Sequence, residues 1–188
     1  MKHKTVLGVW CLSIDKTLEN KMALRIIVLF ISLIITFPSA LIAQDKEGKV
    51  IKLPWTFEAV MDFIWDGDSV RVWSKENGLM LMISFYGIDS PEQTQPFGSK
   101  VKEFLKRELR KNKKFKVTLV KLGKSNTGYG YIHIDGKDLG LMLVKNGLAR
   151  VDLFSGNAFT DPEEKKMYME AEEKARKNKT GIWSLGKD

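Results

Sequence analysis

The stretches Asp66-Gly67-Asp68-Ser69-Val70 and Ile88-Asp89-Ser90-Pro91-Glu92 are two short turns, about twenty residues apart, that together carry four acidic side chains. Gly67 provides the backbone freedom for a tight reversal, and Pro91 ends any strand that reaches Asp89. The sequence between the turns is strand-like, so a chain that doubles back there would bring the carboxylates to one hard cation. Ordinary turn aspartates are the simpler interpretation of either turn alone, and this alternative stays open.

Alternating apolar residues outside and between the turns predict five strands, and helical spacing predicts three helices. The predicted strands cover residues 56–64, 70–73, 79–87, 115–120 and 129–134. The predicted helices cover residues 97–112, 139–144 and a last segment from the Asp161 cap to about Lys179. Residues 121–129 are rich in Gly, Ser and Asn and are expected to form a loop, and Trp183 is expected to fill the core.

Length and composition favour one folded domain, because 188 residues with 44% hydrophobic content form one core of ordinary size. We expect a lead with a signal peptide or anchor at 1–43, a linker at 44–55, the domain at 56–185 and a tail at 186–188.

Residues 26–37 form an uncharged apolar run after Arg25, too short to span a bilayer comfortably and typical of a secretory signal. Cleavage after Ala43 would release an exported chain without stable membrane association, whereas an uncleaved segment would anchor it. Met22 is an alternative start to Met1. The sole cysteine, Cys11, lies in this lead, so the exported chain needs no disulfide.

The formal net charge of +8 favours polyanionic partners. Residues 100–124 hold eleven basic side chains and two acidic ones. This run is either a surface that attracts nucleic acid or simply a solvated helix face that continues into a strand.

Five blocks of the sequence resemble the staphylococcal nuclease-like (thermonuclease) family in order and approximate spacing. They are the Asp66–Val70 block, Tyr86–Glu92, Asp135-Gly136-Lys137, Asn146-Gly147-Leu148-Ala149 and Gly181-Ile182-Trp183-Ser184. The resemblance covers about Thr56 to Leu185. It implies an α+β fold in which a five-stranded oligonucleotide-binding (OB-fold) barrel carries three helices.

The resemblance also implies calcium-dependent hydrolysis of DNA or RNA phosphodiesters, as in a thermonuclease-like endonuclease. Asp68 and Asp89 would be carboxylate ligands of Ca²⁺, Ser90 would add its backbone carbonyl, and Asp66 would support the outer shell of the metal. Glu92 takes the family's place for the group that activates the attacking water. Oxygen ligands suit a hard cation such as Ca²⁺, although another divalent cation is possible.

The sequence departs from the family where two arginines would clamp the phosphate. Ser84 occupies the first position, and either Thr127 or, with the loop shifted, Tyr131 occupies the second. Losing one preorganised donor of this kind typically costs about a hundred- to a thousandfold in rate.

The candidate replacements that could bind nucleic acid are Lys121, Lys124 and Arg71. Two hypotheses follow from the intact acids and the absent arginines. The favoured one is a monomeric, exported, metal-dependent nuclease with weakened catalysis, and the alternative is a non-catalytic OB-fold module that binds nucleic acid or another partner.

Overall fold

The computed structural model describes residues 43–44, 50–154 and 159–186. The chain divides into two units, residues 1–41 and 42–188, and all described residues belong to the second. The expected signal segment and its alternative start therefore lie outside the described residues. Within the described part, no helix combines the length and apolar character that crossing a membrane requires.

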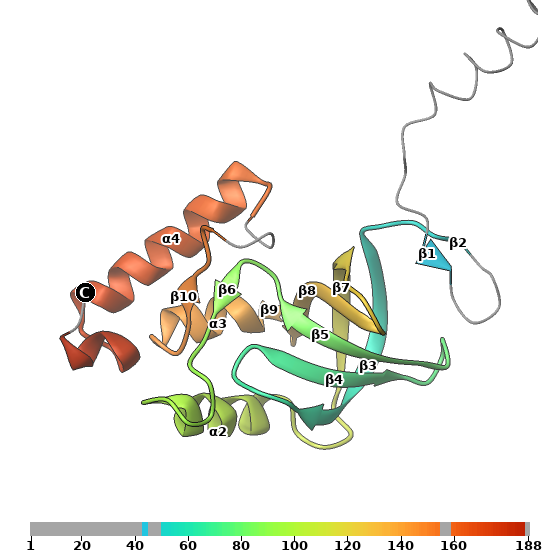
Figure 1. Cartoon of the computed structure of the whole chain (residues 1–188), viewed down its shortest axis with the longest axis horizontal. Helices are drawn as coiled ribbons and strands as arrows, with labels where there is room; N and C mark the ends of the chain where they lie inside the picture. Colours follow the sequence, from blue (N-terminus) through green and yellow to red (C-terminus); the bar gives the residue numbers. More distant parts are fainter. Residues whose placement is uncertain (1–42, 45–49, 155–158, 187–188) are drawn as a thin grey trace, which may run out of the picture. The chain divides into compact units, whose positions relative to one another are not determined.

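Five strands form a closed barrel (Figure 1). They are β3 (Trp55–Ile64), β4 (Ser69–Ser74), β5 (Leu79–Phe85), β7 (Lys114–Leu122) and β8 (Thr127–Ile134). Antiparallel pairing runs in the order β5-β4-β3-β7-β8, and a parallel pairing between β5 and β8 closes the ring. This closed mixed barrel with three helices confirms the predicted α+β, OB-fold class.

The barrel strands follow the alternation that the sequence predicts. In β7, Phe115, Val117 and Leu119 are buried while Lys116 and Thr118 between them are not, and β8 buries every second residue from Gly128 to Ile134. Gly130 has a steric reason to be glycine, because an added Cβ would lie 2.3 Å from the backbone oxygen of Thr118. The small residue lets β7 and β8 approach closely.

A bulge in β3 interrupts this alternation. Met61 pairs with Val72 and Phe63 pairs with Arg71, so one extra residue of β3 is accommodated between two successive pairs. Odd-numbered residues such as Phe57 face the core before the bulge, whereas even-numbered Ile64 does so after it. An extra residue shifts the side-chain period by one, and Phe63 consequently faces outward.

Helix α2 (Gly98–Glu108) packs Val101, Phe104 and Leu105 against the barrel. It is shorter at both ends than the predicted helix at 97–112. Helix α3 (Leu139–Lys145) begins at Asp138, whose Oδ1 accepts hydrogen bonds from the backbone N–H groups of residues 140 and 141. Such a cap satisfies N–H groups that the helix leaves unpaired.

Helix α4 (Pro162–Lys177) starts at the predicted Asp161 cap and buries Tyr168, Ala171 and Ala175. The hydroxyl of Tyr168 donates to Oδ2 of Asp138 at 2.6 Å, so one carboxylate joins the last helix to the start of α3. Figure 1 shows α4 beside β10 (Arg150–Val151) at the same end of the domain as β6 (Ile88–Asp89).

Several short elements were not predicted. β6 pairs with β10, and β9 (Lys137–Asp138) pairs with β8. β1 (Ala43–Gln44) pairs with β2 (Val50–Ile51), so this pair joins the last residue of the expected lead to the expected linker. The last turn, η1 (Gly181–Leu185), is a 3-10 helix.

Three local predictions were wrong. The third strand ends at Phe85 and not at residue 87, because Tyr86 and Gly87 form a turn in which Gly87 has φ of 74°. The expected loop at 121–129 shrinks to residues 123–126, because β7 and β8 extend into it. Trp183 does not fill the core: it is half-buried, with the guanidinium of Arg176 4.3 Å from its ring centroid.

Candidate functional site

The first acidic turn lies between the end of β3, after its bulge, and the start of β4. The backbone N–H groups of Trp65 and Asp66 donate to the carbonyl of Ser69 at 3.0 and 3.4 Å. The backbone N–H of Asp68 donates to Oδ1 of Asp66 at 3.3 Å, and the carbonyl of Asp68 accepts from the N–H of Phe85 at 2.8 Å. The turn is therefore fixed on the strand that leads to the second turn.

The two acidic turns meet at Gly67 and Ser90. A Cβ added to Gly67 would lie 2.2 Å from Oγ of Ser90 and 2.8 Å from the carbonyl oxygen of Pro91. Ser90 is buried, and its Oγ has no hydrogen-bond partner among the described residues. The predicted convergence of the two turns thus exists at the level of the backbone, and it requires glycine at position 67.

Asp68 is the most strongly perturbed carboxyl of the site. Burial, followed by the neighbouring charge of Asp66 and the hydrogen bond with it, raises the pKa of Asp68 from 3.8 to about 7. The hydroxyl of Ser69, which donates to Oδ1 of Asp68 at 3.0 Å, and the backbone of Ser90 oppose this rise. A cation bound beside Asp68 would oppose this rise, because a positive charge favours the ionised carboxylate.

Asp89 lies on strand β6, directly before the buried Ser90. Its partner across the β6–β10 ladder is Arg150, and the Nε of Arg150 lies 4.0 Å from Oδ2 of Asp89. Both side chains are about 60% exposed, 58% for the arginine and 62% for the aspartate, so this ion pair is a weak one. Arg150 was not among the predicted site residues, although it directly follows the 146–149 block.

Glu92 projects into solvent from a rigid turn. The backbone N–H of Glu92 donates to Oε1 of Gln95 at 3.0 Å, and its carbonyl accepts from the N–H of Gln95 at 2.9 Å. Gly98 packs against the same carbonyl, because an added Cβ would lie 1.9 Å from it. The carboxylate of Glu92 is exposed and able to accept a proton.

The described residues contain no group of three or more His, Cys, Asp and Glu side chains arranged to hold a metal ion. Asp66 and Asp68 are in contact, because the backbone N–H of Asp68 donates to Oδ1 of Asp66 at 3.3 Å. A Ca²⁺ ion does not require three acids, because it also accepts backbone carbonyls and several waters among six to eight oxygen ligands. The donor set fits a hydrated hard cation held by few protein groups.

The two positions of the absent arginines hold neutral side chains. Ser84 pairs with Ser69 across β4 and β5, and their hydroxyl oxygens lie 3.1 Å apart. Thr127 donates its hydroxyl to the carbonyl of Lys124, and Tyr131 donates its hydroxyl to Oε2 of Glu164 at 2.7 Å on α4. Neither alignment of the loop therefore supplies a cation.

The three candidate nucleic-acid-binding residues lie on different elements. Arg71, on β4, donates to Oδ2 of Asp62 at 2.5 Å. Lys121, near the end of β7, places its Nζ 5.6 Å from the ring centroid of Tyr129, and Lys124 is exposed in the following loop. They come from two strands and a loop, and the guanidinium of Arg71 is already held by Asp62.

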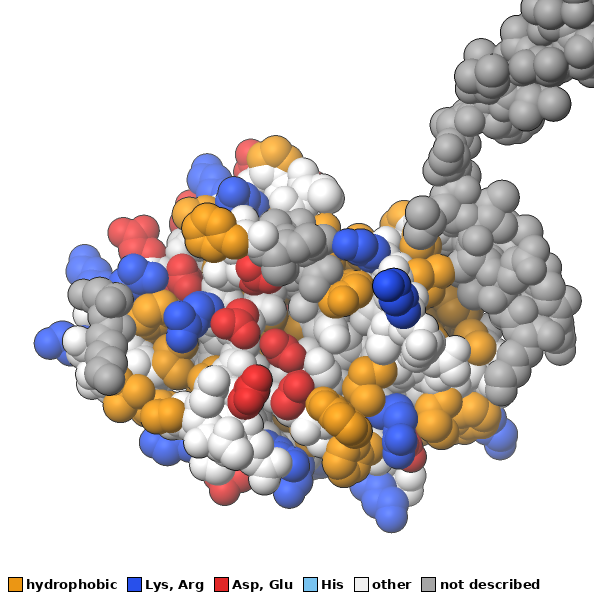
Figure 2. All heavy atoms as spheres, viewed as in Figure 1, with side chains coloured by type: hydrophobic (Ala, Val, Ile, Leu, Met, Phe, Trp, Pro, Cys, Tyr) orange, Lys and Arg blue, Asp and Glu red, His pale blue; other side chains and the backbone are white. Residues whose placement is uncertain are grey.

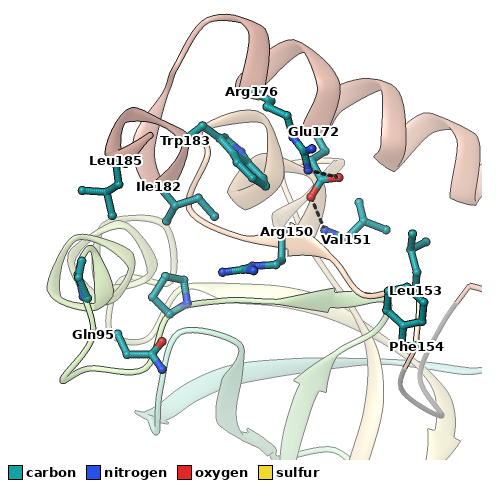
Figure 3. Close-up of a pocket in the computed structure, with 12 residues that line it drawn as sticks. Gln95, Arg150, Val151, Leu153, Phe154, Glu172, Arg176, Ile182, Trp183 and Leu185 are labelled. Carbon is teal, nitrogen blue, oxygen red and sulfur yellow. Dashed lines mark hydrogen bonds and ion pairs between the residues drawn. The ribbon is translucent and has the colours of Figure 1, made fainter. Parts of the chain in front are cut away.

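A groove of about 510 Å³ adjoins the second acidic turn at Pro91. Figure 3 shows Arg150 extending into it, below a network in which Glu172 accepts from the N–H of Val151 at 3.0 Å. Arg176 lies 3.8 Å from the same carboxylate. Helix α4 thus holds β10, and through it the strand that carries Asp89.

A closed five-stranded barrel of this topology defines a member of the oligonucleotide-binding class of folds. The family profile described as "Staphylococcal nuclease homologue" matches residues 82–185. The chain therefore belongs to the staphylococcal nuclease family. The match includes the second acidic turn and begins after the first.

One curated relative is the protein named "Probable endonuclease lcl3" of Schizosaccharomyces japonicus. It is 35% identical to this chain over 132 residues, a match that covers 62% of this chain and 56% of the relative. The chain thus spans little more than half the length of that relative.

Proposed function

We propose that the protein is a metal-dependent nuclease that hydrolyses phosphodiester bonds of DNA, RNA or both, with Ca²⁺ as its cation. Membership of the staphylococcal nuclease family and the endonuclease name of the relative support a nuclease-like function. The observation that carries the finer proposal is the contact between the acidic turns, where Gly67 packs on Ser90 beside the half-buried carboxyl of Asp68.

In this proposal Asp68 and Asp89 bind the cation with their carboxylates, and Ser90 adds its backbone carbonyl. Asp66 orients Asp68 and increases the negative charge around it. A bound divalent cation would polarise the phosphate and lower the pKa of a nearby water. Glu92 takes a proton from the attacking water while the oxygen of that water bonds to phosphorus. The bond between phosphorus and the leaving oxygen then breaks.

Phosphate binding is assigned to cations other than the family's arginines. Arg150, 4.0 Å from Asp89, is the guanidinium most directly placed beside a proposed ligand. Lys121, Lys124 and Arg71 would bind the flanking phosphates of the strand. A lysine presents a point charge and Arg71 is already paired with Asp62, so catalysis below the usual level of the family is expected.

The alternative is a non-catalytic OB-fold module that binds nucleic acid or another partner. The neutral side chains at positions 84 and 127 favour it. The acids discriminate between the two functions, because binding a polyanion benefits from the basic surface but not from a cluster of carboxylates.

The experiment that tests the proposal incubates the purified protein with single-stranded DNA and with RNA, in Ca²⁺ or in chelator. Cleavage that requires Ca²⁺ and disappears in Glu92→Gln supports it, with Glu163→Gln on the exposed start of α4 as the matched control. Tight, salt-sensitive binding without cleavage in Ca²⁺, Mg²⁺ or Mn²⁺ selects the binding module instead.

Metal binding is tested separately by calorimetric titration with Ca²⁺. Asp68→Ala and Asp89→Ala should each weaken binding about tenfold or more, whereas Glu92→Gln should change it little. Unchanged affinity in Asp68→Ala would remove that residue from the ligand set, whatever the outcome of the cleavage assay.

We also propose that the protein is exported by its apolar segment at 26–37 and acts as a monomer. N-terminal sequencing of the protein recovered outside the cell should begin near Gln44. Recovery only with membranes, with residues 26–37 retained, would favour the anchored form.

A further inference from the structure

Two exposed aromatic rings lie where the chain passes from β3 into the first acidic turn, with Phe63 in the strand and Trp65 one residue beyond its end. Trp65 is 62% exposed and Phe63 is 44% exposed. Their ring centroids lie 6.3 Å apart with an interplanar angle of 76°. Trp65 directly precedes Asp66, so the pair borders the candidate site. Large aromatic side chains are usually mostly buried, and an exposed group of them indicates a binding surface.

The bulge in β3 accounts for the exposure of Phe63. Phe57 and Ala59 show that odd-numbered residues face the core in the first part of the strand. Without the extra residue between Met61 and Phe63, the same alternation would have turned Phe63 inward. Bulges are common next to functional sites, where they change the direction of a side chain.

Two cations flank the aromatic pair. The guanidinium carbon of Arg71 lies 5.8 Å from the ring centroid of Phe63, and the Nζ of Lys102 lies 5.9 Å from it. Lys102 also donates to Oε1 of Gln93 at 2.8 Å. Because Gln93 follows Glu92, this lysine connects the aromatic pair to the loop that carries the proposed base.

The four residues Phe63, Trp65, Arg71 and Lys102 are called the aromatic platform below. Figure 2 shows, on one face, acidic side chains gathered with hydrophobic and basic ones close beside them. Exposed rings with adjacent cations match a single strand chemically, because the rings can stack on unpaired bases and the cations can bind the phosphates between them. A base pair inside a duplex does not offer its faces in this way.

We propose that the aromatic platform binds unpaired bases of a single-stranded nucleic acid whose backbone passes the two acidic turns. The inference deepens the proposed function and rests on it, because it takes nucleic acid as the ligand. It adds a preference for single strands over duplex and assigns that preference to Trp65 and Phe63.

Binding is measured by fluorescence anisotropy of a labelled oligothymidylate and of a matched duplex, in chelator so that nothing is cleaved. Trp65→Ala and Phe63→Ala should each weaken binding of the single strand roughly 5- to 100-fold. Trp65→Phe keeps a ring and should stay within a few-fold of the wild type. Met169→Ala, which removes a side chain 42% exposed on α4, is the control and should have no effect.

A second measurement does not depend on the stability of the alanine variants. Stacking of a base on Trp65 should quench part of the tryptophan fluorescence when oligothymidylate is added, and that part should be absent in Trp65→Phe. Unchanged single-strand binding in Trp65→Ala, or equal weakening for strand and duplex, would overturn the proposal. So would binding to anionic phospholipid vesicles that depends on Trp65 when the oligonucleotide does not bind.

Failure of this inference and failure of the nuclease proposal give different results. Ca²⁺-dependent cleavage that Trp65→Ala leaves unchanged, with unchanged binding, rejects the platform and keeps the nuclease. Single-strand binding that depends on Trp65, without cleavage in any divalent metal, rejects the nuclease and keeps the platform.

Discussion

The hydroxyl oxygens of Ser84 and Ser69 lie 3.1 Å apart, and Ser69 in turn donates to Oδ1 of Asp68 at 3.0 Å. Position 84, where the family carries an arginine, is thus connected through the hydroxyl of Ser69 to Asp68, a proposed metal ligand. An arginine at this position would bring a guanidinium to the edge of the site.

We expect Ser84→Arg to raise kcat/KM for phosphodiester cleavage about a hundred- to a thousandfold, because a planar bidentate donor stabilises charge that develops on the phosphate. Ser84→Lys is the matched control and should give a smaller gain, since a lysine adds positive charge but cannot donate two parallel hydrogen bonds as a guanidinium does. Steady-state kinetics on a single-stranded oligonucleotide measure both. An arginine variant no faster than the wild type, with an unchanged unfolding midpoint, contradicts the assignment.

Arg150 is expected to supply part of the missing phosphate clamp. Arg150→Ala should lower kcat/KM about 10- to 100-fold and reduce the salt slope of oligonucleotide binding by about one. Arg150→Lys should restore the salt slope but not the rate. Arg110→Ala, another exposed arginine, is the control for net charge. Equal effects of Arg150→Ala and Arg110→Ala would show that Arg150 acts only through the net positive charge of the protein.

The raised pKa of Asp68, about 7, predicts a pH dependence of stability. The folded protein holds this proton more tightly than the unfolded chain, whose carboxyl has a pKa of 3.8. The contribution of Asp68 to the free energy of unfolding therefore falls as pH rises from about 4 to about 7, and it is constant above that.

Asp68→Asn should remove this dependence. In chelator at pH 8, the substitution should raise the free energy of unfolding by about 1 to 2 kcal/mol, after solvent screening of a half-exposed pair is allowed for. At pH 4 the two proteins should be nearly equal. Urea denaturation at both pH values measures the difference, and a variant that is less stable than the wild type at pH 8 contradicts the prediction.

Gly67→Ala should separate the two acidic turns. The added Cβ would meet Ser90 and Pro91 within 2.8 Å, and the backbone would have to move to accept it. We expect a loss of about 1 to 3 kcal/mol of stability, with weakened Ca²⁺ binding. Gly78→Ala is a useful control, because Gly78 has φ of 59° but no atom within 4 Å of the added Cβ. It should cost about 1 kcal/mol and leave Ca²⁺ affinity unchanged.

The sequence predicts the barrel well where burial alternates over many residues, as in β7 and β8. It does not predict the bulge in β3, because one inserted residue leaves the composition of the strand unchanged and only its pairing partner reveals the shift. Strands β6 and β10 are two residues long, too short for any periodicity. Their pairing joins residues about sixty positions apart, a contact that local propensity does not encode.

In the candidate site, too, some features could be predicted from the sequence and others could not. The contact of the acidic turns follows from a chain that doubles back through β4 and β5, and it could be predicted from Gly67 and the strands between the turns. The position of Arg150 opposite Asp89 could not, because it depends on the β6–β10 ladder. The outward position of Phe63 likewise depends on the bulge and not on the residue type.

The hydrogen bond from the N–H of Val151 to Glu172 has a consequence for biosynthesis. The amino end of a chain leaves the ribosome first, so both acidic turns emerge before helix α4. This helix holds β10, and β10 pairs with the strand that carries Asp89. During translation, the second acidic turn therefore lacks this support until helix α4 has been synthesised. Fragments that end between Val151 and Glu172 would carry every proposed ligand but lack the contact that holds β10.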